Sequence, residues 1–168
     1  MANKIQNFDT GEKDNSNIIH LDLDPKINIE NKIYFKNLLK KIAECSLDNL
    51  EENLENLYHV DAEFNGFHPI NEIKGIEEIK NKYLIPLKKA FPDLERRNNL
   101  VIGGAFRDKV FVSFISHLTG TFKNEWLGVK PTNKTIYLRT CEAHQITNNK
   151  IIKSYTCLLY TSDAADEE

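Results

Sequence analysis

The stretch KVFVSFISHLTGTFKNEWLGVKPT, residues 109–132, indicates how this chain folds. It begins with β-branched and aromatic residues at 110–115, which predict a largely buried strand. Gly120 lies where such a strand often bulges or lets another backbone approach closely. A loop with the only tryptophan, Trp126, then leads to a second strand-like run at 135–146. We therefore predict a long hairpin in a curved sheet that wraps around a pocket.

Helical patterns precede this hairpin, and strand patterns follow them. A first helix is predicted from Asn28 to Ala43 with Ile29 and Ile33 on its buried face, and a second, shorter helix over 46–57. A third is predicted over 76–91 with a break near Leu84, because Pro86 lies inside it. Strands are expected at 60–64, 95–106, 109–122, 135–146 and 151–155. Helices followed by antiparallel strands indicate an α+β fold.

Composition limits the possible functions. With 168 residues, 40% of them hydrophobic, and a net charge of -3, the chain suits one globular domain without a strongly charged partner. Lysines are mixed with acids rather than gathered in a stripe, so no nucleic-acid partner is expected. No apolar run reaches the roughly 20 residues of a membrane span, so no membrane partner is expected either. Three cysteines without metal or redox spacing favour a cytoplasmic location.

The two ends of the chain differ from its middle. Residues 1–27 are mostly polar and are predicted to form a flexible N-terminal arm. Residues 157–167, CLLYTSDAADE, resemble one reading frame of the transposon-end adapter used in shotgun sequencing libraries. We therefore expect 157–168 to be an adapter-derived tail. The predicted domain spans residues 28–156.

Four segments resemble a known family. They are HPINEIKGIEEI (68–79), AFPDLERR (90–97), HLTGTFKNEWLGVKPTNK (117–134) and LRTCEAHQITNNKI (138–151). Together they resemble the SnoaL-like polyketide cyclases and their ester cyclase relatives, which have the nuclear transport factor 2-like fold. The resemblance implies a cone of three N-terminal helices on a curved antiparallel sheet. It also implies a small molecule at the open end, and neither a cofactor nor a metal.

The sequence departs from the family at the position that decides the chemistry. In the polyketide cyclases an aspartate on the last strand is the general base of an aldol ring closure, and that position is Thr156 here. A threonine hydroxyl without a paired base cannot take a proton from a carbon acid near pH 7. Other relatives have an aspartate at the position of Leu159, inside the adapter-like tail. The usual base is therefore absent or replaced.

Three residues are candidate catalytic groups. His117 comes late in an apolar strand, and the resemblance places it in the cone, where it would hydrogen-bond a substrate carbonyl or enolate oxygen. The alternative is a core histidine that bonds a backbone carbonyl. Glu142 and His144 share one face of the next strand because they are two residues apart. On a concave face Glu142 would be a candidate base with a pKa raised by burial, and on a solvent face both would be unremarkable.

Four further residues are expected to line the pocket: Trp126, His68, Tyr155 and Thr156. Trp126 could instead fill the core, and His68 could close a turn before Pro69. We predict cofactor-free acid–base chemistry, an aldol-type cyclisation or an isomerisation, on a small hydrophobic carbonyl compound. The alternatives are a non-catalytic binding module and a scaffold that forms a homodimer through its sheet. A carboxylate in the pocket favours the first, and a filled cone with an exposed apolar sheet favours the last.

Overall fold

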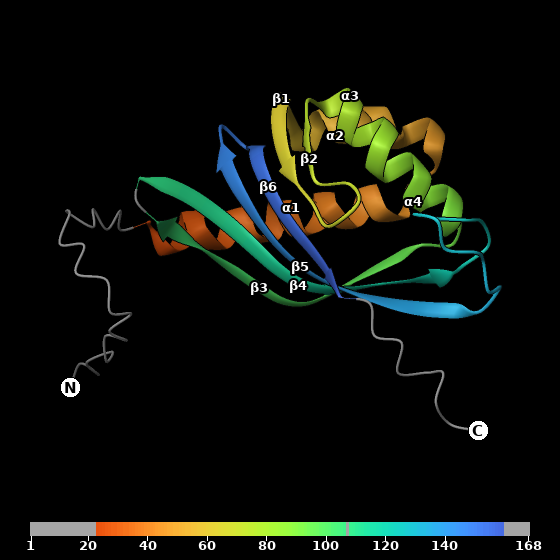
Figure 1. Ribbon diagram of the computed structural model, residues 1–168. Helices are drawn as coiled ribbons and strands as arrows, with labels where there is room; N and C mark the ends of the chain where they lie inside the picture. The colour runs from red at the N-terminus through yellow and green to blue at the C-terminus, as the bar shows by residue number, and fades with distance from the viewer. Residues whose placement is uncertain (1–22, 107, 160–168) are drawn as a thin grey trace, which may run out of the picture.

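The computed structural model describes residues 23–106 and 108–159. Residues 1–22 of the predicted arm and 160–168 of the predicted tail lie outside this part, whereas residues 25–27 of the arm begin the first helix and residues 157–159 of the tail end the last strand. The helices are α1 (Pro25–Glu44), the 3-10 turn η1 (Leu47–Asn49), α2 (Leu50–Leu57), α3 (Ile76–Ile79), the π-helical turn η2 (Lys80–Leu84) and α4 (Ile85–Ala90). The strands are β1 (Tyr58–Asn65), β2 (Glu72–Lys74), β3 (Glu95–Phe106), β4 (Lys109–Thr121), β5 (Thr135–Thr147) and β6 (Lys150–Leu159). The predicted helices and strands follow in the predicted order, and β2 is an additional strand that the sequence analysis did not predict (Figure 1).

The six strands form one curved sheet in the order β2-β1-β6-β5-β4-β3. Strands β3 to β6 pair antiparallel, as expected, but β1 pairs parallel with β6. The expectation of a fully antiparallel sheet is therefore wrong for this pair. No tight turn joins β1 to β6, so the turn geometry that forces antiparallel pairing in a hairpin does not apply.

Gly120 is needed for close packing and not for a bulge. It pairs regularly with Ile136, whereas the β3–β4 register shifts between Asn98 and Leu100, so the bulge expected at Gly120 lies in the neighbouring strand. A Cβ atom on Gly120 would lie 3.2 Å from the Cβ of Phe91 and 3.4 Å from the backbone Cα of Leu94. The other possibility, a close backbone approach, is the correct one.

The third helical segment breaks where the proline predicts. The π-helical turn η2 ends at Leu84, and Pro86 is an early residue of α4. Proline has no N–H to donate to the preceding turn, so a local change in helical bonding at this place is expected. The break is therefore confirmed.

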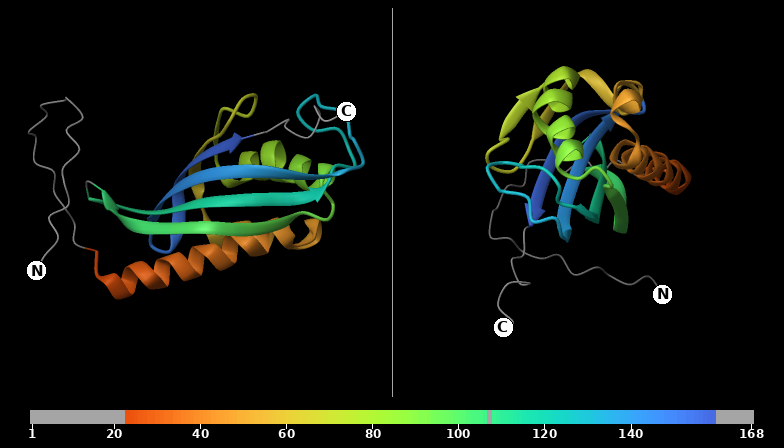
Figure 2. Two further views of the ribbon diagram at one scale, coloured as in Figure 1. Left: turned by 90° about the horizontal axis from the view of Figure 1, so that it is seen from below. Right: turned by 90° about the vertical axis from the view of Figure 1, so that its right-hand side faces the viewer.

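Helix α1 lies along the β3 edge of the sheet (Figure 2). Its buried residues are Phe35, Leu39 and Ile42, whereas Ile29 and Ile33, predicted to be buried, are 52% and 55% exposed. The helix contacts the sheet along a narrow stripe, and at 100° per residue Ile29 and Ile33 fall outside it. At its two ends α1 also binds backbone groups of the edge strand. Asn28 Nδ2 donates to the Gly103 carbonyl at 2.9 Å, and Glu44 Oε1 accepts from the Arg96 N–H at 3.2 Å.

Alternate residues of each strand face opposite sides of the sheet. On the concave face, toward the helices, Phe114, Ser116 and Leu118 of β4 are buried. On the convex face, Ile115 is exposed and His117 is half-buried. No helix in residues 23–106 and 108–159 is both long and apolar enough to cross a membrane.

Candidate functional site

A small cavity lies between the helices and the concave face. It encloses about 40 Å³, which is room for a few water molecules. Apolar side chains of the helices and of β1 form most of its wall. The polar or ionisable side chains in the wall are Tyr58, Tyr83, Lys88, Arg96, Glu142, His144 and Thr156. A mostly apolar space with a few converging polar groups is typical of a ligand site.

The strongest polar contact in this wall is a two-point ion pair between Arg96 of β3 and Glu142 of β5. Nη1 donates to Oε1 at 2.9 Å, and Nη2 donates to Oε2 at 3.0 Å. The remaining guanidinium contacts go to Asn98 Oδ1 at 2.9 Å and to Ser116 Oγ at 3.1 Å. Both charged side chains are almost completely buried. A buried pair with this geometry keeps both groups charged and fixed in position.

Glu142 is therefore a permanent anion. Burial alone raises its pKa, but the Arg96 guanidinium and the hydrogen bond from His144 outweigh burial and hold the pKa well below its usual range. We expected a base with a raised pKa on the concave face. The face is the expected one, but the direction of the pKa shift is corrected, because Arg96 was not recognised as a partner.

His144 lies between this anion and a chain of hydroxyls. Its Nε2 is 3.2 Å from Glu142 Oε2, and its Nδ1 is 2.9 Å from Ser154 Oγ. An ionised carboxylate can only accept, so Nε2 carries a proton and, in the neutral ring, Nδ1 accepts from the Ser154 hydroxyl. Ser154 Oγ in turn lies 3.4 Å from the Tyr58 hydroxyl. Glu142 therefore fixes the tautomer and the orientation of His144.

Two tyrosines provide neutral hydroxyl groups beside this chain. Burial, with a smaller contribution from the Glu142 charge, raises the pKa of Tyr58 to about 12. Burial likewise raises the pKa of Tyr83, whose hydroxyl has no hydrogen-bond partner within the described residues. Both phenols keep their protons at neutral pH, so they can donate to an oxygen atom in the cavity.

Of the seven predicted site residues, three line the cavity: Glu142, His144 and Thr156. Glu142 and His144 both lie on the concave face, which is the face on which they were expected to be catalytic candidates. Thr156 lies directly opposite Glu142 in the β5–β6 register. All three are buried.

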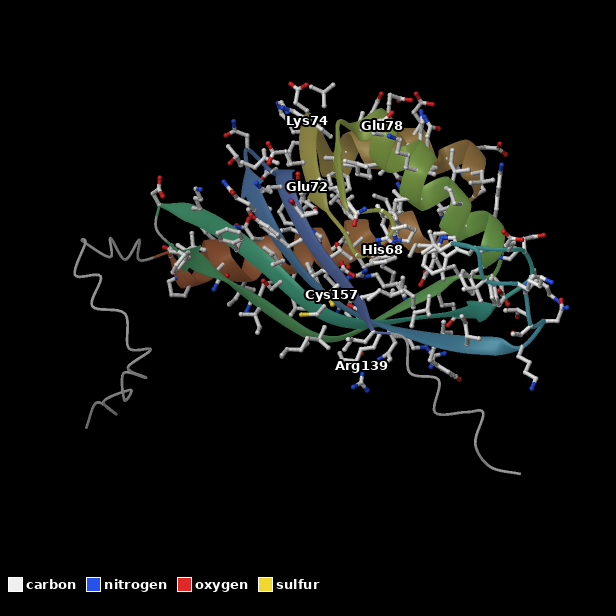
Figure 3. The ribbon with its side chains drawn as sticks, viewed as in Figure 1. His68, Glu72, Lys74, Glu78, Arg139 and Cys157 are labelled. Atoms are coloured by element: carbon white, nitrogen blue, oxygen red, sulfur yellow. The ribbon has the colours of Figure 1, made fainter. Side chains whose placement is uncertain are left out.

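His117 is on the convex face, so the prediction that it lies inside the cone is wrong. Its Nδ1 is 2.7 Å from Asn99 Oδ1, and Arg139 Nε donates to its Nε2 at 3.2 Å. Figure 3 shows Arg139 projecting from the side of the sheet that faces away from the helices. Residues 110–115 carry large apolar side chains on both faces, with Ser113 as the one exception, so their composition did not settle which neighbour, Ser116 or His117, points inward.

The other three residues also lie outside the cavity wall. Trp126 fills the core instead, with ring centroids 6.0 Å from Phe67 and 5.7 Å from Phe91. His68 is exposed beside the cis peptide bond to Pro69, in agreement with the turn alternative. Tyr155 is 45% exposed on the convex face, because its odd position on β6 alternates with buried Ser154 and Thr156.

Sequence reasoning missed Arg96, Tyr58 and Ser154. One signal was present, because two consecutive arginines at the start of a strand must place one side chain on each face. Within residues 23–106 and 108–159, no three His, Cys, Asp or Glu side chains gather in a way that could hold a metal ion.

Solved structures of known proteins share this fold of helices on a curved sheet. AclR from Streptomyces galilaeus, which has been suggested to be a hydroxylase, is 19% identical with a TM-score of 0.62, over 79% of this chain and 76% of its own. A protein from Jannaschia sp. CCS1, assigned to the SnoaL-like polyketide cyclases, is 16% identical with a TM-score of 0.60, over 82% and 90%. A nuclear transport factor 2-like superfamily protein from Salmonella enterica serovar Typhimurium is 12% identical with a TM-score of 0.62, over 85% and 98%. At these identities the similarity shows the fold alone.

No curated protein sequence matches this chain. A family model does: that of the SnoaL-like polyketide cyclases matches residues 36–158. The match covers all six strands and most of the helical layer, including the residues of the cavity wall. This protein, whose fold is similar to that of nuclear transport factor 2-like proteins, belongs to the SnoaL-like polyketide cyclase family.

Proposed function

We propose that this protein binds a small carbonyl compound in its cavity and catalyses a proton transfer on it without a cofactor. The reaction class is an aldol-type cyclisation or an isomerisation, and His144 takes and returns the proton at Nδ1, which becomes free when the Ser154 hydroxyl turns from this nitrogen toward the Tyr58 oxygen. One observation carries this proposal: the ionised Glu142, fixed by Arg96, holds the imidazole of a buried histidine in the cavity wall.

The roles follow from the charges of the groups. Glu142 is not the base, because its pKa is held well below neutral pH. It orients His144 and stabilises the imidazolium that forms when the ring takes a proton, as the carboxylate does in an Asp–His pair. Imidazole titrates near neutral pH, which suits a general base and acid. The neutral hydroxyls of Tyr58 and Tyr83 would donate to the enolate oxygen that develops on the substrate.

The size of the cavity restricts the ligand. A volume of about 40 Å³ has no room for a polycyclic compound unless side chains move. We therefore propose a ligand of few carbon atoms. A non-catalytic binding module is the alternative, since the same wall could bind a ligand without reacting with it.

Hydrogen exchange tests the proposal without knowledge of the natural substrate. Small ketones, such as cyclopentanone and acetylacetone, are incubated in D2O with the protein, and loss of the α-proton signal is followed by NMR. We expect the wild type to accelerate exchange and His144→Gln to lose this acceleration by about 100-fold or more. His117→Gln, on the opposite face, is the matched control and keeps it. Binding without exchange would favour the binding module, and the absence of both would reject the site.

We also propose that the convex face pairs two copies of the chain. Large apolar side chains are exposed there: Leu100, Ile102, Ile115, Tyr137 and Tyr155. An apolar surface of this kind on a sheet is typical of an interface. In sedimentation experiments, wild type should behave as a dimer and Ile102→Lys as a folded monomer, and a monomeric wild type at 100 µM would contradict this.

A further inference from the structure

Lys88 of α4 is a buried lysine in the wall of the cavity. Only 7% of its surface is exposed. Its Nζ donates to the carbonyl oxygens of Ala43 and Cys45, at 2.9 and 2.7 Å, where α1 ends. The thiol of Cys45, a weak acceptor, also lies beside the ammonium group. These partners are all uncharged, so they satisfy hydrogen bonds but do not balance the charge.

The cavity wall is therefore not neutral. Apart from His144, three buried side chains of the described residues are basic or acidic: Lys88, whose pKa is lowered by burial, Arg96 and Glu142. Arg96 and Glu142 neutralise each other. No carboxylate in residues 23–106 and 108–159 lies within ion-pair distance of Lys88. Glu44, the nearest acid in sequence to its two carbonyl partners, accepts from the Arg96 N–H and lies 3.8 Å from Lys40 Nζ. Among the described residues Lys88 therefore has no directly bonded counter-ion, and Glu44 contributes only a weaker attraction from farther away.

We propose that the ligand of this cavity is a small keto acid and that Lys88 is the residue that recognises its carboxylate. This inference rests on the proposed function, because the ketone of the same compound would lie toward His144. A buried ammonium without a counter-ion is costly, and a ligand carboxylate would provide the missing charge together with a strong acceptor. Lys88 is a specificity-determining residue in this proposal and takes no part in the proton transfer.

A purely structural role is the competing explanation. A cation at the C-terminus of a helix bonds the last carbonyls and interacts favourably with the helix dipole. That role requires nothing of the ligand, so it predicts no preference for an anion. The two explanations therefore differ in a measurable property of the wild-type protein.

Acetoacetate and acetylacetone are matched probes, because a carboxylate oxygen in the first stands where the second has a methyl group. We expect wild type to bind acetoacetate at least 10-fold more tightly than acetylacetone at pH 7, as measured by calorimetry or NMR titration. Lys88→Met should reduce this preference to less than twofold, and Lys88→Arg should retain it. The exposed neighbour gives the control, since Lys89→Met should change nothing.

The outcomes separate the two levels of the proposal. Equal binding of both probes to the wild type overturns the keto-acid inference and leaves the proposed function standing, and so does a preference that survives in Lys88→Met. If neither probe binds, the proposed function fails as well. If Lys88→Met does not fold, the preference of the wild type for acetoacetate over acetylacetone still tests the keto-acid inference. A loss of α-proton exchange on the neutral ketone in Lys88→Met would show that Lys88 stabilises the enolate oxygen, which also overturns the inference.

Discussion

The two faces of this sheet use the same side chains for opposite purposes. Arg96 and Arg97 are neighbours on β3, yet Arg96 forms a buried two-point ion pair, whereas Arg97 makes an exposed contact with Glu95 at 3.2 Å. The two strand histidines differ in the same way. His144 is buried against a carboxylate, and His117 bonds Asn99 and Arg139 on the convex face.

The comparison shows that the role of a side chain in this sheet depends on the face on which it lies and not on its residue type. Each strand alternates between a dry side and a wet side, so a displacement of one residue changes the surroundings of a charge from protein to water. The dry side strengthens electrostatic contacts and makes an unpaired charge costly. Substitutions on the two faces should therefore differ sharply in their effects.

The largest effect is expected where the buried pair is broken. Arg96→Met leaves the Glu142 carboxylate buried without its partner, so we expect a loss of about 3–5 kcal/mol in the free energy of unfolding. The double variant Arg96→Met/Glu142→Leu removes both charges and should recover at least half of this loss. The free energy of unfolding of the wild type, the single variant and the double variant is measured by urea denaturation. A loss below about 1 kcal/mol for the single variant would mean that the pair is not desolvated.

The stability contributed by the Arg96–Glu142 pair should also be lost at acidic pH. The pKa of Glu142 is lowered in the folded state, so its contribution is complete above the unfolded value of 4.5 and is lost as the pH falls below it. Between pH 5 and pH 3 we expect the wild type to lose about 2 kcal/mol more than the Arg96→Met/Glu142→Leu variant. Parallel stability curves for the two proteins, measured by urea denaturation at each pH, would show that the pair contributes nothing to acid sensitivity.

A smaller effect is expected at Gly120, where the end of β4 meets the turn before β3. A Cβ there would lie 3.2 Å from the Cβ of Phe91 and 3.4 Å from the Cα of Leu94, so Gly120→Val forces these groups apart. We expect a loss of about 1–2 kcal/mol, measured by thermal or urea denaturation. Gly104→Val, where a Cβ would meet nothing within 4 Å, is the matched control.

The smallest effect belongs to the convex face. His117→Gln and Arg97→Met should each change the free energy of unfolding by no more than about 0.5 kcal/mol, since their partners remain accessible to water. These are the counterparts of the substitutions at His144 and Arg96. If either costs more than about 2 kcal/mol, the contrast between the faces does not hold.

Sequence alone predicted the α+β cone because its signals are local or belong to the family pattern. The break near Leu84 follows from Pro86, and the strands follow from runs of β-branched residues. The site was harder, since it depends on which residues of a strand face inward. The family resemblance placed His117 inside, whereas the alternation along β4 puts Ser116 on the concave face and His117 on the convex face. The Arg96–Glu142 contact joins residues 46 positions apart, so no local sequence pattern predicts it.

The position of helix α1 has a consequence for how this protein can associate. Asn28 and Glu44 bind backbone groups at the two ends of β3, and the opposite edge of the sheet, β2, is only three residues long. These contacts at one edge and the short strand at the other disfavour growth by strand addition. Release of α1 would uncover the backbone groups of β3 for an incoming strand.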